Sequence, residues 1–430
     1  MRLSNLNNGM NVLFISLLIT LVLTSFAFSQ NFEIKESLYE ASKIKTTQLS
    51  PLTVKKLNEA QLMVNDGYNQ AALNSLNRTL YQVKSPYEKA VIIQTAAHII
   101  LLKDDQQAYL QAIELFETVV QLNALTDAEQ RNILLNIALL NGQLENYKQA
   151  VIWFQKWMSE QQYANKEIDS KKIMQLAQFY QLDEQLNIAE TYYQKAIKQA
   201  IKNKEPVIES WYVQWLSVNY NLENFKKCEA ILTLLISMSA DKLQYYRQLA
   251  GIYEWQDNSK QALSAWEMAY KQSLLTEKED VILLAQLLLR LNYPLKAAKV
   301  LDQFYKQSDS KTLLEQDYEL LARAWNEALE FEQAIASYKK AFNVLKNPKY
   351  AQVIAQLYIE KLDFQNALEN LNKVTENQSG EYYLLLGYVY VQLDNTLKAM
   401  TAYEQATKFE KSKNQAIEWL EYLSIIATNK

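Results

Sequence analysis

Apolar and small residues recur along this 430-residue chain in a fixed order, most clearly near its end. Tyr383, Leu386, Gly387 and Tyr390 follow the spacing i, i+3, i+4, i+7, which predicts one face of a helix. A second periodic stretch begins at Ala399 and continues with an aromatic residue four positions later and an alanine three positions after that. The pattern therefore predicts two consecutive helices that pack through small side chains and rings.

The same two-helix pattern recurs through most of the chain. Its second helix is marked by a small residue at ten places: Ala71, Ala112, Ala150, Ala189, Cys228, Ala262, Ala297, Ala334, Ala367 and Ala399. The mean spacing of these positions is about 36 residues, close to the period of about 34 of one class of helical repeat. The stretch from Asn414 to Ile426 has helical spacing but no partner helix after it. We therefore expect ten helical hairpins followed by one capping helix.

The repeated pattern resembles the tetratricopeptide repeat (TPR), whose signature is W-x2-L-G-x2-Y followed by A-x3-F. In this chain tyrosine replaces the tryptophan and the phenylalanine of the clearest copy. The resemblance implies an all-α fold, a TPR-type α-solenoid in which the hairpins stack as a right-handed superhelix. The expected segments are a leader at 1–29, irregular TPR-like hairpins at 30–205, a regular TPR array at 206–410, and a capping helix with its tail at 411–430.

Composition agrees with a helical fold. Hydrophobic residues make up 49% of the chain, and only 6 Gly and 5 Pro occur in it. Sheet-rich folds need many turn residues, and phosphate-binding loops need clustered glycines. The sequence therefore disfavours both.

The first 29 residues predict a secretory leader. Arg2 precedes an uncharged apolar run from Val12 to Phe28, which ends at Ala27-Phe28-Ser29. Small residues at these places are typical of a cleaved signal peptide, so we expect cleavage after Ser29 and a periplasmic protein. An uncleaved anchor is the alternative, because 17 residues is about the shortest membrane span. After cleavage no membrane-spanning segment is expected.

Little in the sequence supports catalysis. The chain has one His and one Cys, so metal clusters and Ser-His-Asp arrangements are disfavoured. Cys228 occupies a position where other repeats have Ala, which predicts a buried thiol. The net charge of −4 argues against nucleic-acid binding. We expect no catalytic residues, no metal and no cofactor, and the oligomeric state is left open.

A TPR solenoid has a concave wall formed by the first helix of each hairpin, and partners bind there. Polar and aromatic residues next to the packing positions are the candidates for this wall, because Arg and exposed aromatics are common interface anchors. The predicted partner-binding residues are Gln178, Ser217, Arg247, Glu254, Trp255, Gln286, Arg290, Arg323, Glu327 and Tyr388. Trp255 and Tyr388 have an alternative role, packing against a neighbouring hairpin.

The second half of the chain also resembles a narrower family, the exported TPR proteins encoded beside TonB–ExbB–ExbD systems of Gram-negative bacteria. The resemblance rests on residues 275–287 (LTEKEDVILLAQL), 293–298 (YPLKAA), 245–251 (YYRQLAG) and 416–423 (AIEWLEYL). It implies a periplasmic accessory of TonB-linked uptake, with a TonB/ExbB/ExbD-type complex or an outer-membrane transporter as partner. These are packing segments, so no functional residue is carried over.

Two alternatives stay open at this point. One is a scaffold for outer-membrane or polysaccharide-export assembly. The other is an enzyme acting on glycans through a carboxylate pair about 5 to 9 Å apart in a deep pocket.

Overall fold

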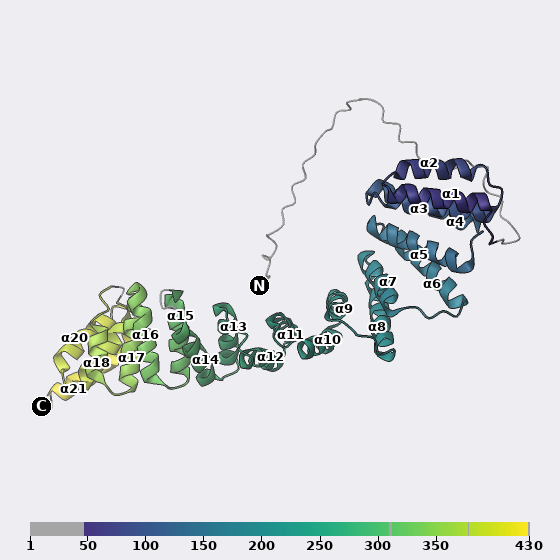
Figure 1. Ribbon diagram of the computed structural model, residues 1–430. Helices are drawn as coiled ribbons and strands as arrows, with labels where there is room; N and C mark the ends of the chain where they lie inside the picture. The colour runs from purple at the N-terminus through teal and green to yellow at the C-terminus, as the bar shows by residue number, and fades with distance from the viewer. Residues whose placement is uncertain (1–46, 309–311, 377, 429–430) are drawn as a thin grey trace, which may run out of the picture. The chain divides into compact units, whose positions relative to one another are not determined.

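The computed structural model describes residues 47–308, 312–376 and 378–428, and within these ranges it contains 21 α-helices and no strand (Figure 1). The predicted leader at 1–29 and its cleavage site after Ser29 lie outside the described residues. The helices are α1 (Pro51–Asn65), α2 (Asn69–Leu80), α3 (Pro86–Leu101), α4 (Gln106–Leu122), α5 (Asp127–Gln143), α6 (Tyr147–Tyr163), α7 (Ser170–Leu182), α8 (Leu186–Lys202), α9 (Glu209–Asn221), α10 (Phe225–Met238), α11 (Leu243–Trp255), α12 (Ser259–Lys271), α13 (Lys278–Arg290), α14 (Pro294–Gln307), α15 (Glu315–Glu327), α16 (Phe331–Leu345), α17 (Pro348–Glu360), α18 (Phe364–Leu371), α19 (Gly380–Gln392), α20 (Thr396–Ala406) and α21 (Lys413–Thr428).

The helices pair in chain order as ten hairpins, from α1–α2 to α19–α20, and α21 packs on the last of them. This confirms the predicted all-α solenoid of ten hairpins with a capping helix. We call the first helix of each hairpin its A helix, with an odd number, and the second its B helix. The capping helix buries Ala416 and Leu423 against the side chains of Ala399, Tyr403 and Ala406.

Small side chains mark where the two helices of a hairpin approach each other. Nine of the ten predicted positions, from Ala112 to Ala399, have no exposed surface at all. The prediction for the first hairpin was wrong by one residue, because Ala71 is exposed and Ala72 is the buried alanine of α2. Two adjacent alanines give no sign in the sequence of which one faces the partner helix.

The turn inside each hairpin has one repeated geometry. Each of the ten A–B turns contains one residue with positive φ: Gly67, Asp104, Glu145, Glu184, Glu223, Asp257, Asn292, Leu329, Leu362 and Asp394. In nine of them the next residue donates its backbone N–H to the carbonyl five positions earlier, as Asn146 does to Asn141 at 2.9 Å. This is the Schellman ending of an α-helix, which satisfies the last carbonyls of the A helix and reverses the chain in three residues.

The prolines lie at the start of helices or between them. Pro51, Pro86, Pro294 and Pro348 each stand in the first turn of a helix, and Pro206 lies between α8 and α9. The first turn needs no backbone N–H from proline, so the ring costs nothing there.

The chain divides into two compact units at Asn203–Lys204. The first contains α1 to α8, with a continuous hydrophobic core from Ala60 to Leu140 that joins α1 through α5. The second contains α9 to α21 and holds nine of the ten predicted partner-binding residues.

Candidate partner-binding groove

All ten predicted partner-binding residues lie on A helices. Gln178 is half-buried on α7 of the first unit, and the others lie in the second unit on α9, α11, α13, α15 and α19. Their surroundings differ widely, and only part of the set lies in one place.

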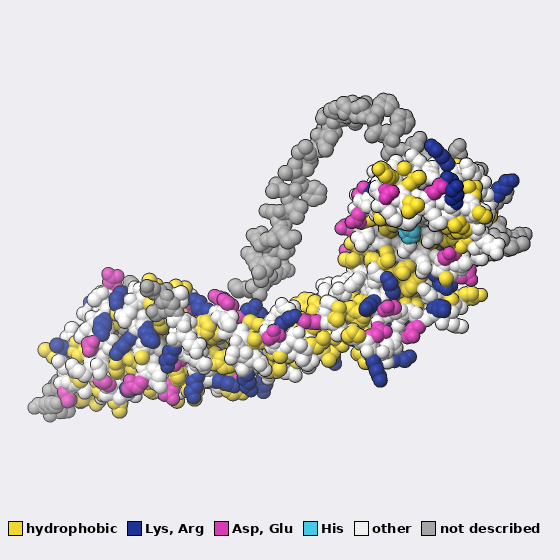
Figure 2. Space-filling view, viewed as in Figure 1, with side chains coloured by type: hydrophobic (Ala, Val, Ile, Leu, Met, Phe, Trp, Pro, Cys, Tyr) yellow, Lys and Arg dark blue, Asp and Glu magenta, His cyan; other side chains and the backbone are white. Residues whose placement is uncertain are grey.

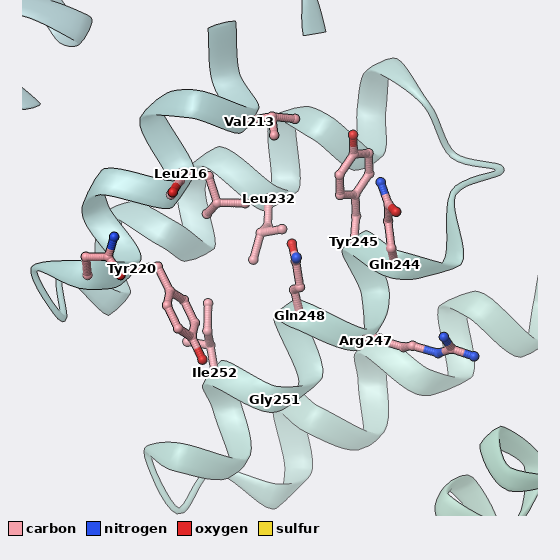
Figure 3. Close-up of a pocket in the computed structure, with 12 residues that line it drawn as sticks. Val213, Leu216, Tyr220, Leu232, Gln244, Tyr245, Arg247, Gln248, Gly251 and Ile252 are labelled. Atoms are coloured by element: carbon pink, nitrogen blue, oxygen red, sulfur yellow. The ribbon is translucent and has the colours of Figure 1, made fainter. Parts of the chain in front are cut away.

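A hollow in the second unit lies between α9 and α11, with Leu232 of α10 behind it (Figure 3). Its volume is about 720 Å³. It is lined by Val213, Leu216, Ser217, Tyr220, Asn221, Leu232, Gln244, Tyr245, Arg247, Gln248, Gly251 and Ile252. Of the predicted residues, Ser217 and Arg247 are therefore part of this lining.

A smaller hollow continues the first one towards the ends of α9 and α11. It is lined by Tyr220, Glu223, Phe225, Gly251, Ile252 and Trp255, three of which also line the larger hollow. Trp255 is 68% exposed, and its ring lies 4.7 Å from the ring of Phe225, so it both packs on α10 and faces solvent. We call the two hollows together the α9–α11 groove. Hydrophobic side chains gather over α9 to α11 in Figure 2.

Small residues at one repeat position explain why the groove is open between α9 and α11. Ser217 on α9 and Gly251 on α11 occupy equivalent repeat positions, directly after the packing residues Leu216 and Ala250. The same position carries Gln286, Arg323 and Tyr388 in other hairpins. A side chain added at Gly251 would meet no atom within 4 Å of its Cβ, so glycine leaves open space there.

Arg247 stands at the edge of the groove but points away from it in Figure 3. Its guanidinium forms two hydrogen bonds to the buried carboxylate of Asp280 on α13, with Nε at 2.9 Å from Oδ1. This bidentate geometry fixes the side chain. Arg247 therefore joins two neighbouring A helices and offers no free cation to a ligand.

The remaining charged candidates also pair with each other. Arg290 on α13 binds Glu254 on α11, with Nη2 at 2.5 Å from Oε2. Arg323 and Glu327 form a looser pair within α15 at 3.6 Å. Each pair is half-exposed, so each contributes at most about 1 kcal/mol to stability. Gln286 is exposed on α13.

Tyr388 lies among other rings. It is half-buried, with ring centroids 6.2 Å from Phe364 and 6.3 Å from Trp419 of the capping helix. Tyr388 therefore has the alternative role given above, packing against neighbouring helices. It lies on α19 and does not line the groove.

Neighbouring A helices of the second unit are joined by polar links at most steps. Glu209 on α9 accepts hydrogen bonds from Lys242, at 2.6 Å, and from Tyr245. Lys278 on α13 binds Asp317 on α15 at 3.0 Å. Glu319 on α15 accepts hydrogen bonds from Lys349 and from Tyr350 at the start of α17. The first of these links joins the two helices that form the walls of the groove, and the others join A helices further along the second unit.

Groups suited to catalysis are dispersed. Cys228 is fully buried in α10, and burial raises the pKa of its thiol to about 11. His98 lies on α3 of the first unit, edge-on to Phe116. Among the described residues no group of three or more His, Cys, Asp or Glu side chains is arranged to hold a metal ion. The larger hollow of the groove has no carboxylate in its lining.

The comparisons with known proteins agree with the fold. Residues 380–413, which span α19 and α20, match the sequence profile described as Tetratricopeptide repeat. The structure is an all-α solenoid of TPR-type hairpins, a fold that implies protein–protein interaction. No curated protein matches the chain. Within the described ranges, no helix is both long and apolar enough to cross a membrane.

Several solved structures are similar at low sequence identity. A TPR protein from Parabacteroides merdae is 12% identical, covering 60% of this chain and 99% of its own, with a TM-score of 0.30. MamA is 17% identical, covering 40% and 94%, with a TM-score of 0.34. The Naa15/Naa10 complex bound to HypK matches at 12% identity over 85% of this chain and 64% of the matched chain, with a TM-score of 0.42.

Sequence reasoning missed most of the groove lining. Val213, Tyr220, Gln244, Gln248 and Gly251 were not among the predicted residues. Gly251 was the one available signal in the sequence. Glycine inside a helix is unfavourable by about 1 kcal/mol relative to Ala, and only 6 Gly occur in the chain, so a glycine within a predicted helix indicates a special position.

Proposed function

We propose that this protein is a non-enzymatic scaffold that binds a segment of a protein partner in the α9–α11 groove. The observation that carries the proposal is the groove itself, an open hollow with an apolar floor and exposed Tyr220 and Trp255 at its walls. Exposed aromatics around a hollow are typical anchors of protein interfaces. The TPR-type fold supports the same role, since the stacked A helices form an extended binding surface.

We further propose that the protein works in the periplasm as an accessory of a TonB-linked uptake system. The leader-like sequence at 1–29 supports export. The resemblance of the second half to exported TPR proteins beside TonB–ExbB–ExbD systems supports this partner class. The partner in this proposal is a component of that inner-membrane complex or an outer-membrane transporter.

Site-specific crosslinking in intact cells tests both parts. A photoreactive residue replaces Val213 in the groove, and the matched control carries it at Lys260, an exposed position on α12 outside the groove. The proposal expects identified envelope proteins at Val213 and none of them at Lys260. Recovery of cytoplasmic proteins alone contradicts the location, and equal recovery at both positions contradicts the groove. Recovery of an outer-membrane assembly or polysaccharide-export component instead favours that alternative.

A further inference from the structure

The walls of the α9–α11 groove are α-helices, and this limits how a bound segment satisfies its own backbone. Inside a helix the N–H and C=O groups bond to each other, so the walls present no strand edge to a bound peptide. A peptide in the groove therefore either satisfies its backbone internally, as a helix, or receives hydrogen bonds from side chains of the walls.

Side chains that can form such bonds are present and unoccupied. Ser217, Asn221 and Gln248 line the groove, and no other described residue forms a hydrogen bond with their side chains. Gln248 points into the hollow in Figure 3. An extended peptide has free carbonyls for these donors, whereas a bound helix would cover them without replacing the water they lose. The groove therefore favours an extended segment.

The charge of the groove also restricts its ligand. The single charged residue in the lining of the larger hollow, Arg247, has its guanidinium on Asp280. Glu223 stands in the turn at the far end of the smaller hollow. A charged side chain of a partner would lose water on entering the larger hollow and find no opposite charge available there, which is costly. The part of the segment that lies in the larger hollow is therefore expected to be uncharged.

The exposed aromatic side chains of the groove favour one kind of extended segment. Tyr220 is 57% exposed, and it lies between the apolar floor of the larger hollow and the Trp255–Phe225 pair. Grooves lined by exposed aromatics bind proline-rich segments, whose polyproline II conformation exists before binding and so loses little entropy. Proline also has no N–H, so it packs on an apolar floor without leaving a buried donor unpaired.

We propose that the α9–α11 groove binds a proline-rich segment of the partner in the extended polyproline II conformation, with uncharged residues in the larger hollow. Prolines pack against Tyr220, Trp255 and the floor at Gly251, and the carbonyls between them accept hydrogen bonds from the amides and hydroxyl of the walls. This inference rests on the proposed scaffold function and names the chemistry of the segment that the scaffold recognises.

The test measures binding of fluorescent peptides to the natural protein purified from cells, by fluorescence anisotropy. The first probe is a peptide of alternating alanine and proline. A second has glycine in place of each proline, and a third is an uncharged amphipathic helical peptide. Saturable binding of the proline peptide, with about tenfold weaker binding of the glycine peptide, supports the inference. Preferential binding of the helical peptide overturns it.

Gly251→Leu closes the groove with little risk to the fold, because its Cβ would meet no atom and leucine favours a helix. The matched control is Ser264→Leu, which adds a leucine at an exposed position of α12. We expect at least about tenfold weaker proline-peptide binding by Gly251→Leu and no change by Ser264→Leu.

The outcomes separate the two proposals. If Gly251→Leu abolishes crosslinking of the natural partner but the proline peptide does not bind the unmodified protein, the scaffold role stands and the proline inference is wrong. If neither partner crosslinking nor peptide binding depends on Gly251, both are wrong.

Discussion

Two glycines inside A helices have opposite surroundings, and they show how one residue type serves packing in one hairpin and leaves space in another. A Cβ at Gly387 of α19 would lie 2.6 Å from the ring of Tyr403, which is fully buried. A Cβ at Gly251 of α11 would meet nothing within 4 Å. Gly387 is required for the close approach of α19 and α20, whereas Gly251 keeps the groove open.

Alanine at these two positions should therefore have opposite effects on stability. Gly387→Ala forces the Tyr403 ring to move and is expected to lower the free energy of unfolding by about 1–3 kcal/mol. Gly251→Ala is expected to raise it by about 0.5–1 kcal/mol, because alanine favours the helix and has room. Urea unfolding of both variants measures the difference. Equal effects of the same sign would contradict this account.

The Arg247–Asp280 pair is unequal in its burial, because Asp280 is almost fully buried and Arg247 is half-exposed. Arg247→Ala leaves a buried carboxylate without its partner, and we expect a loss of about 2–3 kcal/mol in the free energy of unfolding. In the double variant with Asp280→Asn the loss should be smaller than the sum of the two single losses. A double-mutant cycle from urea unfolding measures this coupling, and strict additivity would refute it.

At the scale of the element, the A–B turns repeat one left-handed residue in every hairpin, and most of these residues are Asp, Glu, Asn or Gly. Leu329 and Leu362 are the exceptions. Leu329 has φ 61° and is 74% exposed, so its side chain contributes little packing to offset the unfavourable backbone conformation.

Leu329→Asn should stabilise the α15–α16 turn by about 0.5–1 kcal/mol, because asparagine tolerates the left-handed conformation. Leu397→Asn is the matched control, since Leu397 is equally exposed but lies within α20. The control is expected to be neutral or slightly destabilising, because asparagine is a poor helix former. Thermal unfolding of both variants distinguishes a turn effect from a general effect of removing an exposed leucine.

The polar links between A helices predict how stability depends on pH. Hydrogen bonds from Lys242 and Tyr245 lower the pKa of Glu209 below its ordinary value of 4.5. Burial raises the pKa of Glu319, but hydrogen bonds from Tyr350 and Lys349 outweigh it, so the net shift is also downward. A carboxyl whose pKa is lower in the folded state stabilises the fold above its unfolded pKa and loses that contribution as pH falls through the folded value.

The free energy of unfolding should therefore decline as the pH falls below about 4.5. The double variant Glu209→Gln, Glu319→Gln should show a smaller decline over the same range, because two of the responsible carboxyls are gone. Urea unfolding at a series of pH values measures both slopes. Identical slopes would show that these two links do not contribute.

At the scale of the whole molecule, the period of the small residues was sufficient to predict the number of hairpins, and the helical spacing of residues 414–426 predicted the capping helix. Neither pattern was sufficient to predict the groove. Arg247 was predicted to face a partner, but its side chain binds Asp280 of the next hairpin, 33 residues further along the chain. The groove depends on two small residues of neighbouring hairpins, Ser217 and Gly251, which leave space between α9 and α11. The sequence prediction selected mainly large polar and aromatic side chains as anchors, so it did not include Gly251.

The division at Asn203–Lys204 predicts that the second unit folds without the first. A fragment of residues 204–430 contains both walls of the groove and its own capping helix. We expect it to be helical by circular dichroism and to unfold cooperatively, because the hairpins of a solenoid are stabilised mainly by their neighbours. A fragment without a cooperative transition would show that the second unit does not fold by itself.

Cys228 gives the molecule a practical property. It is the only sulfhydryl of the sequence, it has no exposed surface, and its raised pKa keeps it protonated near neutral pH. The folded protein is therefore expected not to react with maleimides and other alkylating reagents. A cysteine engineered beside the groove can be labelled selectively. The rate at which Cys228 itself is alkylated measures how often the fifth hairpin, α9–α10, opens.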